Sequence, residues 1–174
     1  MYAVDAGHGQ LLGSLRQDAR VVNLERVNLA ELNVETVPDT IEVVTLDLSY
    51  LALADAAPQL ETLRLAADVH AVALVKPQFE LRLAAPPDDE ALLRAAVEHA
   101  RDGFARAGWT VEAVIESPVL GSRGAREFLL HASSDEGRRR TVLSSRGRAR
   151  GDRDHDLEPC RIAPLLRPDR GRRP

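Results

Sequence analysis

Short apolar runs alternate with amphipathic segments along most of the chain, which is the pattern of a mainly parallel β-sheet wrapped by helices. The apolar runs predict strands at Tyr2–Ala6, Val21–Leu24, Ile41–Leu46, His70–Val75, Trp109–Glu116 and Glu127–Ala132. The 3.6-residue periodicity predicts helices at Gln10–Arg16, Leu53–Leu65 and Asp88–Ala107, with a short turn near Leu29–Leu32. Several strand segments are almost continuously apolar, as expected of strands that are buried on both faces.

The clearest helix signal is the segment Asp88–Ala107. Its first turn carries acidic residues, which the helix dipole favours, and Gly108 stands where a left-handed C-terminal cap is expected. The two last strands are joined by Ser117–Arg126, which is too short for a crossover helix. We therefore expect these two strands to be antiparallel neighbours.

Length and composition predict one globular domain followed by a tail. The chain has 174 residues, of which 44% are hydrophobic, enough for one domain with a real core. The domain is placed at residues 1–136. No apolar stretch approaches the roughly 18 residues that span a bilayer, and the first residues do not resemble a signal peptide, so we expect a cytoplasmic protein without membrane contact.

Charge divides the chain into an acidic body and a basic end. Residues 137–174 contain 12 arginines and 5 acidic residues, whereas residues 1–136 contain 11 cationic and 22 acidic residues. The basic segment is poor in apolar periodicity, so we expect it to be disordered. It is interpreted as a solvated extension, with RNA binding through phosphate contacts as the alternative.

Cysteine and histidine usage excludes two kinds of structural site. Cys160 is the only cysteine, so no intrachain disulfide is possible. The five histidines are scattered without metal-ligand spacing. We therefore expect no structural metal.

Charged side chains recur where the predicted strands end. Asp5, Glu25, Asp47 and Lys76 lie at or next to the carboxyl ends of parallel strands, which is where open parallel sheets bind ligands. Glu127 begins the last strand, and because that strand runs the other way, its start lies at the same edge. Any single acid at such an end can instead cap the next helix, but five charged residues together favour a site.

Lys76 is the only lysine of the chain, since every other Lys+Arg residue is an arginine. An ammonium can lose its proton where a guanidinium cannot, so the two are not interchangeable at a site that needs a base. Lys76 is thus the first catalytic candidate. The alternative is chance survival in an arginine-rich composition.

A glycine-rich segment follows the first predicted strand and opens a helix. Gly7, Gly9 and Gly13, with Glu25 as a ribose-binding acid, superficially suggest a dinucleotide-binding fingerprint. Glu25 follows too closely for that motif, and the glycine spacing differs from it. A tight turn before a helix is the commoner meaning.

Five motifs, in order, carry a resemblance to a known family. They are Val4–Leu11, Asn23–Asn28, Leu46–Leu51, the segment Leu-Val-Lys-Pro-Gln-Phe-Glu at 74–80, and Ser117-Pro118 with Arg126–Leu130. The chain resembles the TlyA-type ribosomal RNA 2'-O-methyltransferases, also known as haemolysin A, which are relatives of the FtsJ/RrmJ methyltransferases. The resemblance covers roughly Tyr2 to His131, and the segment around Lys76 is its most specific part.

The resemblance implies an α/β fold: a Rossmann-like S-adenosylmethionine-dependent methyltransferase sheet with helices on both faces. It implies the cofactor S-adenosyl-L-methionine and a Lys-Asp-Lys-Glu catalytic tetrad, in which Asp47, Lys76 and Glu127 match the last three members. Asp5 matches the acid that binds the cofactor ribose. Glu25 to Asn28 match the loop beside the adenine, and Asp47 also lies on the cofactor side.

Several family features have no counterpart between Tyr2 and His131. The family's first strand with its glycine-rich loop, the first tetrad lysine and a small S4-type RNA-binding domain would all stand ahead of Tyr2. In the family the first strand is central, between the strands that carry Asp5 and Asp47, so we expect the sheet to lack it there. After Glu80 the family has a longer glycine-rich basic loop, whereas this chain passes directly into a helix.

The expected function is S-adenosylmethionine-dependent methylation of RNA, at the ribose 2'-hydroxyl of ribosomal RNA. In the hypothetical mechanism, Lys76 takes the hydroxyl proton while Asp47 and Glu127 orient the lysine and the nucleotide. The alternative is a non-catalytic remnant or RNA-binding protein of the same family. A nicotinamide-type dinucleotide binder built on Gly7 and Gly9 is the third possibility, and the position of Asp5 argues against it.

Overall fold

The computed structural model describes residues 1–135, so the predicted domain end at residue 136 and the arginine-rich segment lie outside the described residues. The elements, in chain order, are β1 (Tyr2–Asp5), α1 (Gly13–Arg16), β2 (Val22–Glu25), η1 (Leu29–Glu31), β3 (Ile41–Leu46), α2 (Leu53–Ala56), η2 (Ala57–Thr62), β4 (Leu65–Val75), α3 (Pro77–Glu80), α4 (Glu90–Arg106), β5 (Thr110–Glu116), η3 (Ser122–Gly124) and β6 (Phe128–Asp135).

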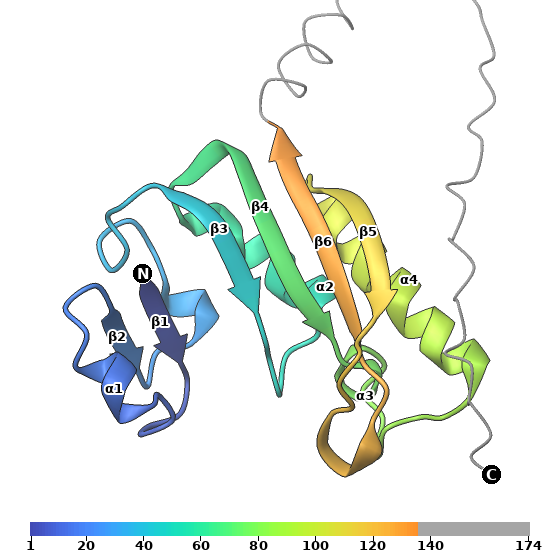
Figure 1. Cartoon of the computed structure of the whole chain (residues 1–174). Helices are drawn as coiled ribbons and strands as arrows, with labels where there is room; N and C mark the ends of the chain where they lie inside the picture. The colour runs from blue at the N-terminus through green and yellow to red at the C-terminus, as the bar shows by residue number, and fades with distance from the viewer. Residues whose placement is uncertain (136–174) are drawn as a thin grey trace, which may run out of the picture.

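The described strands form two sheets that lie edge to edge. β1 and β2 pair in parallel, and a second sheet has the order β3-β4-β6-β5. β3 and β4 are parallel, whereas β6 is antiparallel to both β4 and β5, which confirms the antiparallel pairing predicted for the last two strands. β1 and β3 are the facing edges of the two sheets (Figure 1). The two sheets are separated between the strands that precede Asp47 and end at Asp5, which is where the resemblance placed the family's first strand.

A cleft of about 990 Å³ occupies the space between the two sheets. Every residue of β1 and of β3 lines it, from Tyr2 to Asp5 on one wall and from Ile41 to Leu46 on the other. Side chains tie the two walls together at one end, where the Tyr2 hydroxyl donates to Asp39 Oδ2 over 2.8 Å. The two edges thus line one cleft along their full length.

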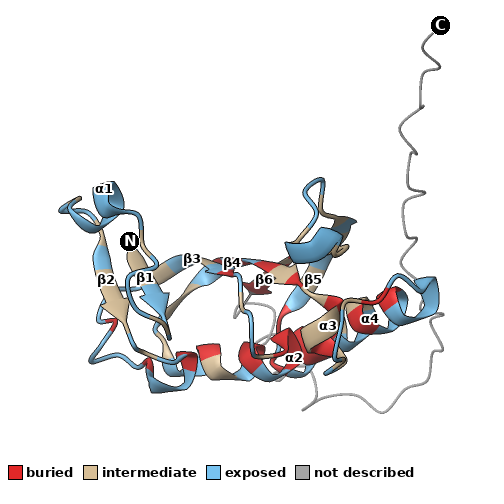
Figure 2. Ribbon diagram, turned by 90° about the horizontal axis from the view of Figure 1, so that it is seen from below, coloured by how far each residue is buried: buried red, intermediate tan, exposed pale blue. Residues whose placement is uncertain are grey.

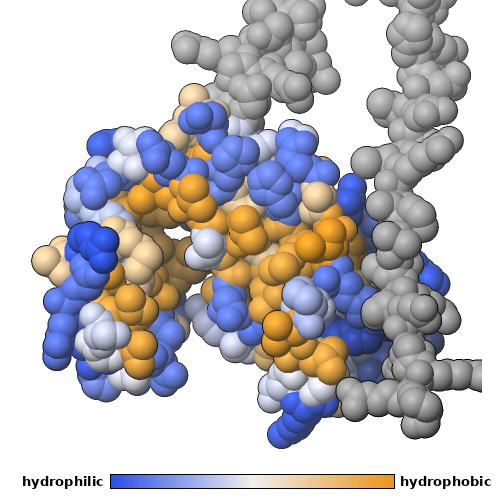
Figure 3. Space-filling view, viewed as in Figure 1, coloured by the Kyte–Doolittle hydropathy of each residue, from blue (hydrophilic) through white to orange (hydrophobic). Residues whose placement is uncertain are grey.

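Helices lie on both sides of the sheet plane. α2, η2 and α4 cover one face of the four-stranded sheet, and α1 lies on the opposite side, beside β1 and β2 (Figure 2). The other face of the four-stranded sheet carries exposed apolar side chains; Val43, Val72 and Ile115 have 62%, 39% and 59% of their surface exposed. Apolar surface gathers over this sheet in Figure 3.

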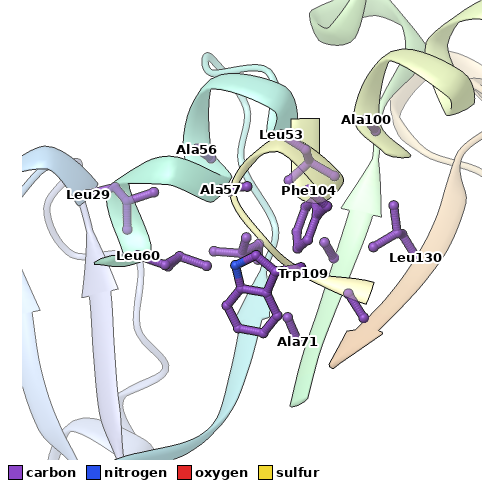
Figure 4. Packing of buried hydrophobic residues seen from close by; sticks show 14 of the residues in the cluster. Leu29, Leu53, Ala56, Ala57, Leu60, Ala71, Ala100, Phe104, Trp109 and Leu130 are labelled. Carbon is purple, nitrogen blue, oxygen red and sulfur yellow. The ribbon is translucent and has the colours of Figure 1, made fainter. Parts of the chain in front are cut away.

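The core lies between the four-stranded sheet and the helices beneath it. Ala71 on β4 and Leu130 on β6 belong to the same cluster as Leu53 and Phe104 from the helices (Figure 4). The rings of Phe104 and Trp109 meet edge to face with centroids 6.0 Å apart, a favourable aromatic geometry. This packing holds α2 and α4 against β4, which ends directly before Lys76, and against β6, which begins directly after Glu127.

α4 follows the predicted pattern. Asp89 caps its N-terminus by accepting bonds from the backbone N–H groups of Ala91 and Leu92, and Gly108 adopts the predicted left-handed conformation with φ 81°. Its buried side falls at the spacing of one helical face: Leu93, Ala96, Ala100, Gly103 and Phe104.

Some predicted boundaries were wrong. The helix predicted at Leu53–Leu65 is a single α-turn followed by the 3₁₀ segment η2, because Pro58 cannot donate a backbone bond in a continuing α-helix. β4 begins at Leu65 rather than His70, since its first half pairs with the end of β6. The helix predicted from Gln10 starts only at Gly13, and α3 and η3 were not predicted. None of the described helices has the length and apolarity needed to cross a membrane.

Candidate active site

The predicted charged residues meet at one edge of the molecule. Asp5 and Glu25 are the last residues of β1 and β2, Asp47 follows β3, and Lys76 follows β4. These four strands point the same way (Figure 1). Glu127 immediately precedes the antiparallel β6, so it lies at this edge as well. The geometry thus places all five residues at the same edge: Asp5, Glu25 and Asp47 line the cleft, and Lys76 and Glu127 line a smaller pocket.

Lys76 and Asp47 form an ion pair at this edge. Lys76 Nζ lies 2.6 Å from Asp47 Oδ1, and it donates to the Ser49 hydroxyl over 3.4 Å. The Lys76 side chain is only 17% exposed, whereas that of Asp47 is 72% exposed. An amine is therefore held in a sheltered position, with its carboxylate partner on the solvent side. Ser49 was quoted in a motif but had no predicted role.

Glu127 and Lys76 line the same small pocket of about 160 Å³. Ser49, Lys76, Phe79 and Glu127 are among the residues that line it. The pocket therefore carries an amine, a carboxylate and a hydroxyl on its walls, next to an aromatic ring. Such a set can hold a polar group and exchange a proton with it.

Arg126 clamps the segment that carries Glu127. Its guanidinium donates two bonds to Glu116, at 2.6 and 3.0 Å, and one to Glu90 at 2.6 Å. The bond from Arg126 holds the pKa of Glu116 below its usual range. One side chain thus joins β5 and α4 to the segment before β6. It holds the backbone next to Glu127 in place.

Gly121 lies directly against the Glu127 carboxylate. A β-carbon at position 121 would be 2.2 Å from Glu127 Oε1, closer than any real contact. The Gly121 φ of −71° is ordinary, so the requirement is for space rather than for unusual backbone. Sequence reasoning could not find this requirement, because the contact joins two positions of a loop that share no helical or strand periodicity.

Asp5 and Glu25 stand at the carboxyl end of the cleft, which Asp47 also lines. Asp5 Oδ1 accepts the Gly7 N–H at 2.6 Å. The Glu25 carboxylate accepts from Gly9 N, and lies 2.8 Å from Arg16 and 2.6 Å from His8. Both acids therefore shape the loop after β1.

The Glu25 carboxylate has more partners in that loop than the Asp5 carboxylate has. Hydrogen bonding from Asn23, together with Gly9, Arg16 and His8, lowers the pKa of Glu25. Its two oxygens each have a partner within the loop. This weakens the dinucleotide interpretation, since the supposed ribose acid is bonded to the glycine-rich loop itself. α1 is also a single turn.

Asn28 caps η1. Its backbone N–H and its side-chain amide both donate to Glu31 Oε2, at 2.7 and 3.0 Å. Val27 and Leu29 line the cleft on either side of it. The loop predicted to lie beside an adenine thus borders the cleft mainly through its apolar neighbours, while the Asn28 side chain stabilises the loop.

Comparison with known proteins decides the family. The family model of FtsJ-like methyltransferase matches residues 1–134, nearly the whole described part of the chain. The chain belongs to the FtsJ-like methyltransferase family. This FtsJ-like chain is 35% identical over 151 residues to the 16S/23S rRNA (cytidine-2'-O)-methyltransferase TlyA of Mycobacterium tuberculosis, a match that covers 83% of the chain and 54% of the relative.

Two further relatives agree with this assignment. Hemolysin A of Brachyspira hyodysenteriae is 34% identical over 146 residues, which cover 75% of the chain and 57% of the relative. A solved structure described as a hemolysin from Streptococcus thermophilus superposes with a TM-score of 0.71 at 30% identity, over 78% of this chain and 50% of that one. The FtsJ-like chain therefore spans about half the length of the curated relatives it matches.

Proposed function

We propose that the chain carries the catalytic and part of the cofactor-binding machinery of an S-adenosylmethionine-dependent RNA methyltransferase, acting on the ribose 2'-hydroxyl of ribosomal RNA. The observation that carries the proposal is the sheltered Lys76 amine, 2.6 Å from Asp47 and on the same pocket as Glu127, in a member of the FtsJ-like family. The M. tuberculosis relative's name gives the reaction class.

The cleft fits one part of the cofactor. Asp5 accepts one hydrogen bond, from the Gly7 N–H to its Oδ1. Its carboxylate lies at the edge of the cleft, where the ribose hydroxyls of S-adenosylmethionine would bind. The apolar side chains of Val27 and Leu48 line the same cleft and would pack against an adenine ring. When bound, the cofactor supplies an electrophilic methyl group. The Glu25–Asn28 loop would border it.

Lys76 acts as the general base. A 2'-hydroxyl is a poor nucleophile until its proton is removed, and a positioned base contributes about 10²–10⁴ to such a step. In its neutral form, Lys76 Nζ takes that proton within the pocket, and the ammonium that results is the partner of Asp47 in the 2.6 Å ion pair. Glu127, which lines the same pocket, accepts a hydrogen bond from a hydroxyl of the same nucleotide and fixes its orientation.

Transfer of a labelled methyl group to RNA tests the function. The 174-residue chain is incubated with S-adenosylmethionine carrying a labelled methyl group and with ribosomal RNA, and the RNA is digested to nucleosides for mass spectrometry. The proposal expects label on 2'-O-methylnucleosides. Label on a base, or cofactor binding without any transfer to RNA, would overturn the assignment of the reaction.

A non-catalytic role is the second candidate, and a specific observation favours it. The facing edges of β1 and β3 leave the cofactor side of the cleft open along both strands, and residues 1–136 hold twice as many acidic as cationic residues, which opposes phosphate binding. A chain in this role binds no S-adenosylmethionine. Retained RNA binding without cofactor binding would favour it.

A further inference from the structure

Glu80 is a buried carboxylate that the proposed chemistry does not use. It is 4% exposed, and with Ser134 it makes up the buried polar residues of the described chain. Burial raises the pKa of Glu80, against the opposing effect of its hydrogen bonds. Buried acids are costly unless they are paired, so this residue needs a reason for its position.

The carboxylate of Glu80 bridges three helices. Its Oε1 accepts the backbone N–H of Leu53, the first residue of α2, in a short hydrogen bond. Its Oε2 lies 3.1 Å from Nδ1 of His99 on α4. Glu80 itself ends α3, so one side chain links α3 to the start of α2 and to the middle of α4.

Two of the linked helices, α3 and α2, follow Lys76 and Asp47 along the chain. α3 begins immediately after Lys76, and the backbone N–H groups of Phe79 and Glu80 both donate to the Lys76 carbonyl, at 2.9 and 3.1 Å. α2 begins six residues after Asp47, behind the loop that carries Ser49. The Glu80–Leu53 bond therefore joins the backbone behind Lys76 to the backbone behind Asp47.

We propose that Glu80 is a positioning residue, which sets the separation of Lys76 and Asp47 by holding the start of α2 against the end of α3. Close packing of α2 on α4 supports the bridge from the other side: a β-carbon on Gly103 would lie 2.2 Å from the Ala54 α-carbon. With α2 seated on α4 in this way, the Glu80 bond fixes the end of the loop that runs from Asp47 to Leu53. The meaning of the role rests on the proposed function, but its geometry does not.

The single lysine makes the role measurable without cofactor or RNA. Lysine-selective ¹³C and ¹⁵N labelling gives one side-chain signal, from Lys76 alone. Asp47→Asn, which removes the ion pair, sets the reference shift of that signal. Glu80→Met keeps the side-chain length but has no oxygen acceptor, whereas Glu80→Gln keeps an acceptor for Leu53 N. Glu98→Gln, at an exposed position on α4, is the matched control.

The proposal expects Glu80→Met to shift the Lys76 signal by at least half of the reference shift, and Glu80→Gln and Glu98→Gln to leave it in place. A folded Glu80→Met protein with an unchanged Lys76 signal overturns it, since a purely structural residue would alter stability alone. If Glu80→Met does not fold, His99→Leu removes the α4 end of the bridge at a side chain that is 43% exposed. It is expected to shift the signal in the same direction, and no shift overturns the proposal. Failure of methyl transfer changes none of these outcomes.

Discussion

Lys76 and Asp47 close the carboxyl ends of β4 and β3 with an ion pair of 2.6 Å. The two residues are 29 positions apart in the sequence, and the parallel register of the strands brings them together, with Leu46 opposite Ala73. The ion pair holds the Lys76 amine in position, and that position therefore depends on the Asp47 carboxylate.

Replacing Lys76 by arginine tests the need for a base. Lys76→Arg keeps the positive charge beside Asp47 but supplies a guanidinium that cannot accept a proton. We expect methyl transfer to fall by about 10²–10⁴ while S-adenosylmethionine binding is unchanged. Nucleoside mass spectrometry and calorimetric binding provide the two readouts. Arg94→Lys, on α4 away from the pocket, is the control, and full transfer by Lys76→Arg would falsify the assignment of the base.

The Gly121 contact predicts a selective defect. Gly121→Ala places a methyl group where the Glu127 carboxylate now lies, so that carboxylate must shift from its present position. A displacement on the order of 1 Å at a catalytic group can cost about a hundredfold in rate. We expect transfer to fall on that scale with cofactor binding retained. Gly13→Ala is the matched control, since a β-carbon at Gly13 has no atom within 4 Å; equal transfer by the two variants contradicts the role of Gly121.

The close approach of α2 and α4 predicts a stability defect elsewhere. Gly103→Ala would place its β-carbon 2.2 Å from the backbone of Ala54, so the helices must separate. Overpacking of this kind costs about 1–3 kcal/mol. We expect the free energy of unfolding, measured by urea titration, to fall by an amount near the upper end of this range. Gly13→Ala is expected to be neutral or stabilising, because its added methyl group meets open space and reduces the freedom of the unfolded chain.

The Arg126 clamp predicts a pH-dependent contribution to stability. The pKa of Glu116 is lowered by Arg126 from its ordinary value of 4.5, so the folded state holds a proton on this group less readily than the unfolded state. Its contribution is present above pH 4.5 and is lost as the pH falls through the lowered pKa. Glu116→Gln should cost about 1 kcal/mol at neutral pH.

Urea titrations at neutral pH and at pH values below 4.5 check this prediction. The difference between wild type and Glu116→Gln is expected to shrink toward zero in acid. Glu42→Gln, at an exposed position of β3, is the control. A difference that stays constant with pH would show that Glu116 acts through its size rather than its charge.

Much of the fold and of the edge site follows from the sequence alone. The strand carrying Asp47 was predicted with its observed bounds, because its apolar run is flanked by polar residues on both sides. The strand ahead of Lys76 was predicted too short, since Asp68 and its alanine neighbours do not look like a strand until β6 supplies their partners. Strand order explains why Lys76, Asp47 and Glu127 could be grouped before the structure was known.

The supporting residues could not be found in the same way. Glu80 looks like one more polar residue in a short motif, and only the approach of α2 shows that its carboxylate is buried and shared. Gly121 and Arg126 act through contacts across loops, which have no period in the sequence. Asn28 was predicted to border a cofactor, and the structure shows its side chain bonded to Glu31.

Equilibrium binding of S-adenosylmethionine to the chain tests the central claim most directly. The account predicts measurable binding of S-adenosylmethionine, no binding of a nicotinamide dinucleotide, and at least about tenfold weaker S-adenosylmethionine binding in Asp5→Ala, where the charged acceptor for the ribose hydroxyls is lost. Glu98→Gln, at an exposed position on α4 outside the cleft, should bind as the wild type does. Absence of S-adenosylmethionine binding, binding of the nicotinamide dinucleotide in its place, or unchanged affinity in Asp5→Ala would contradict the account.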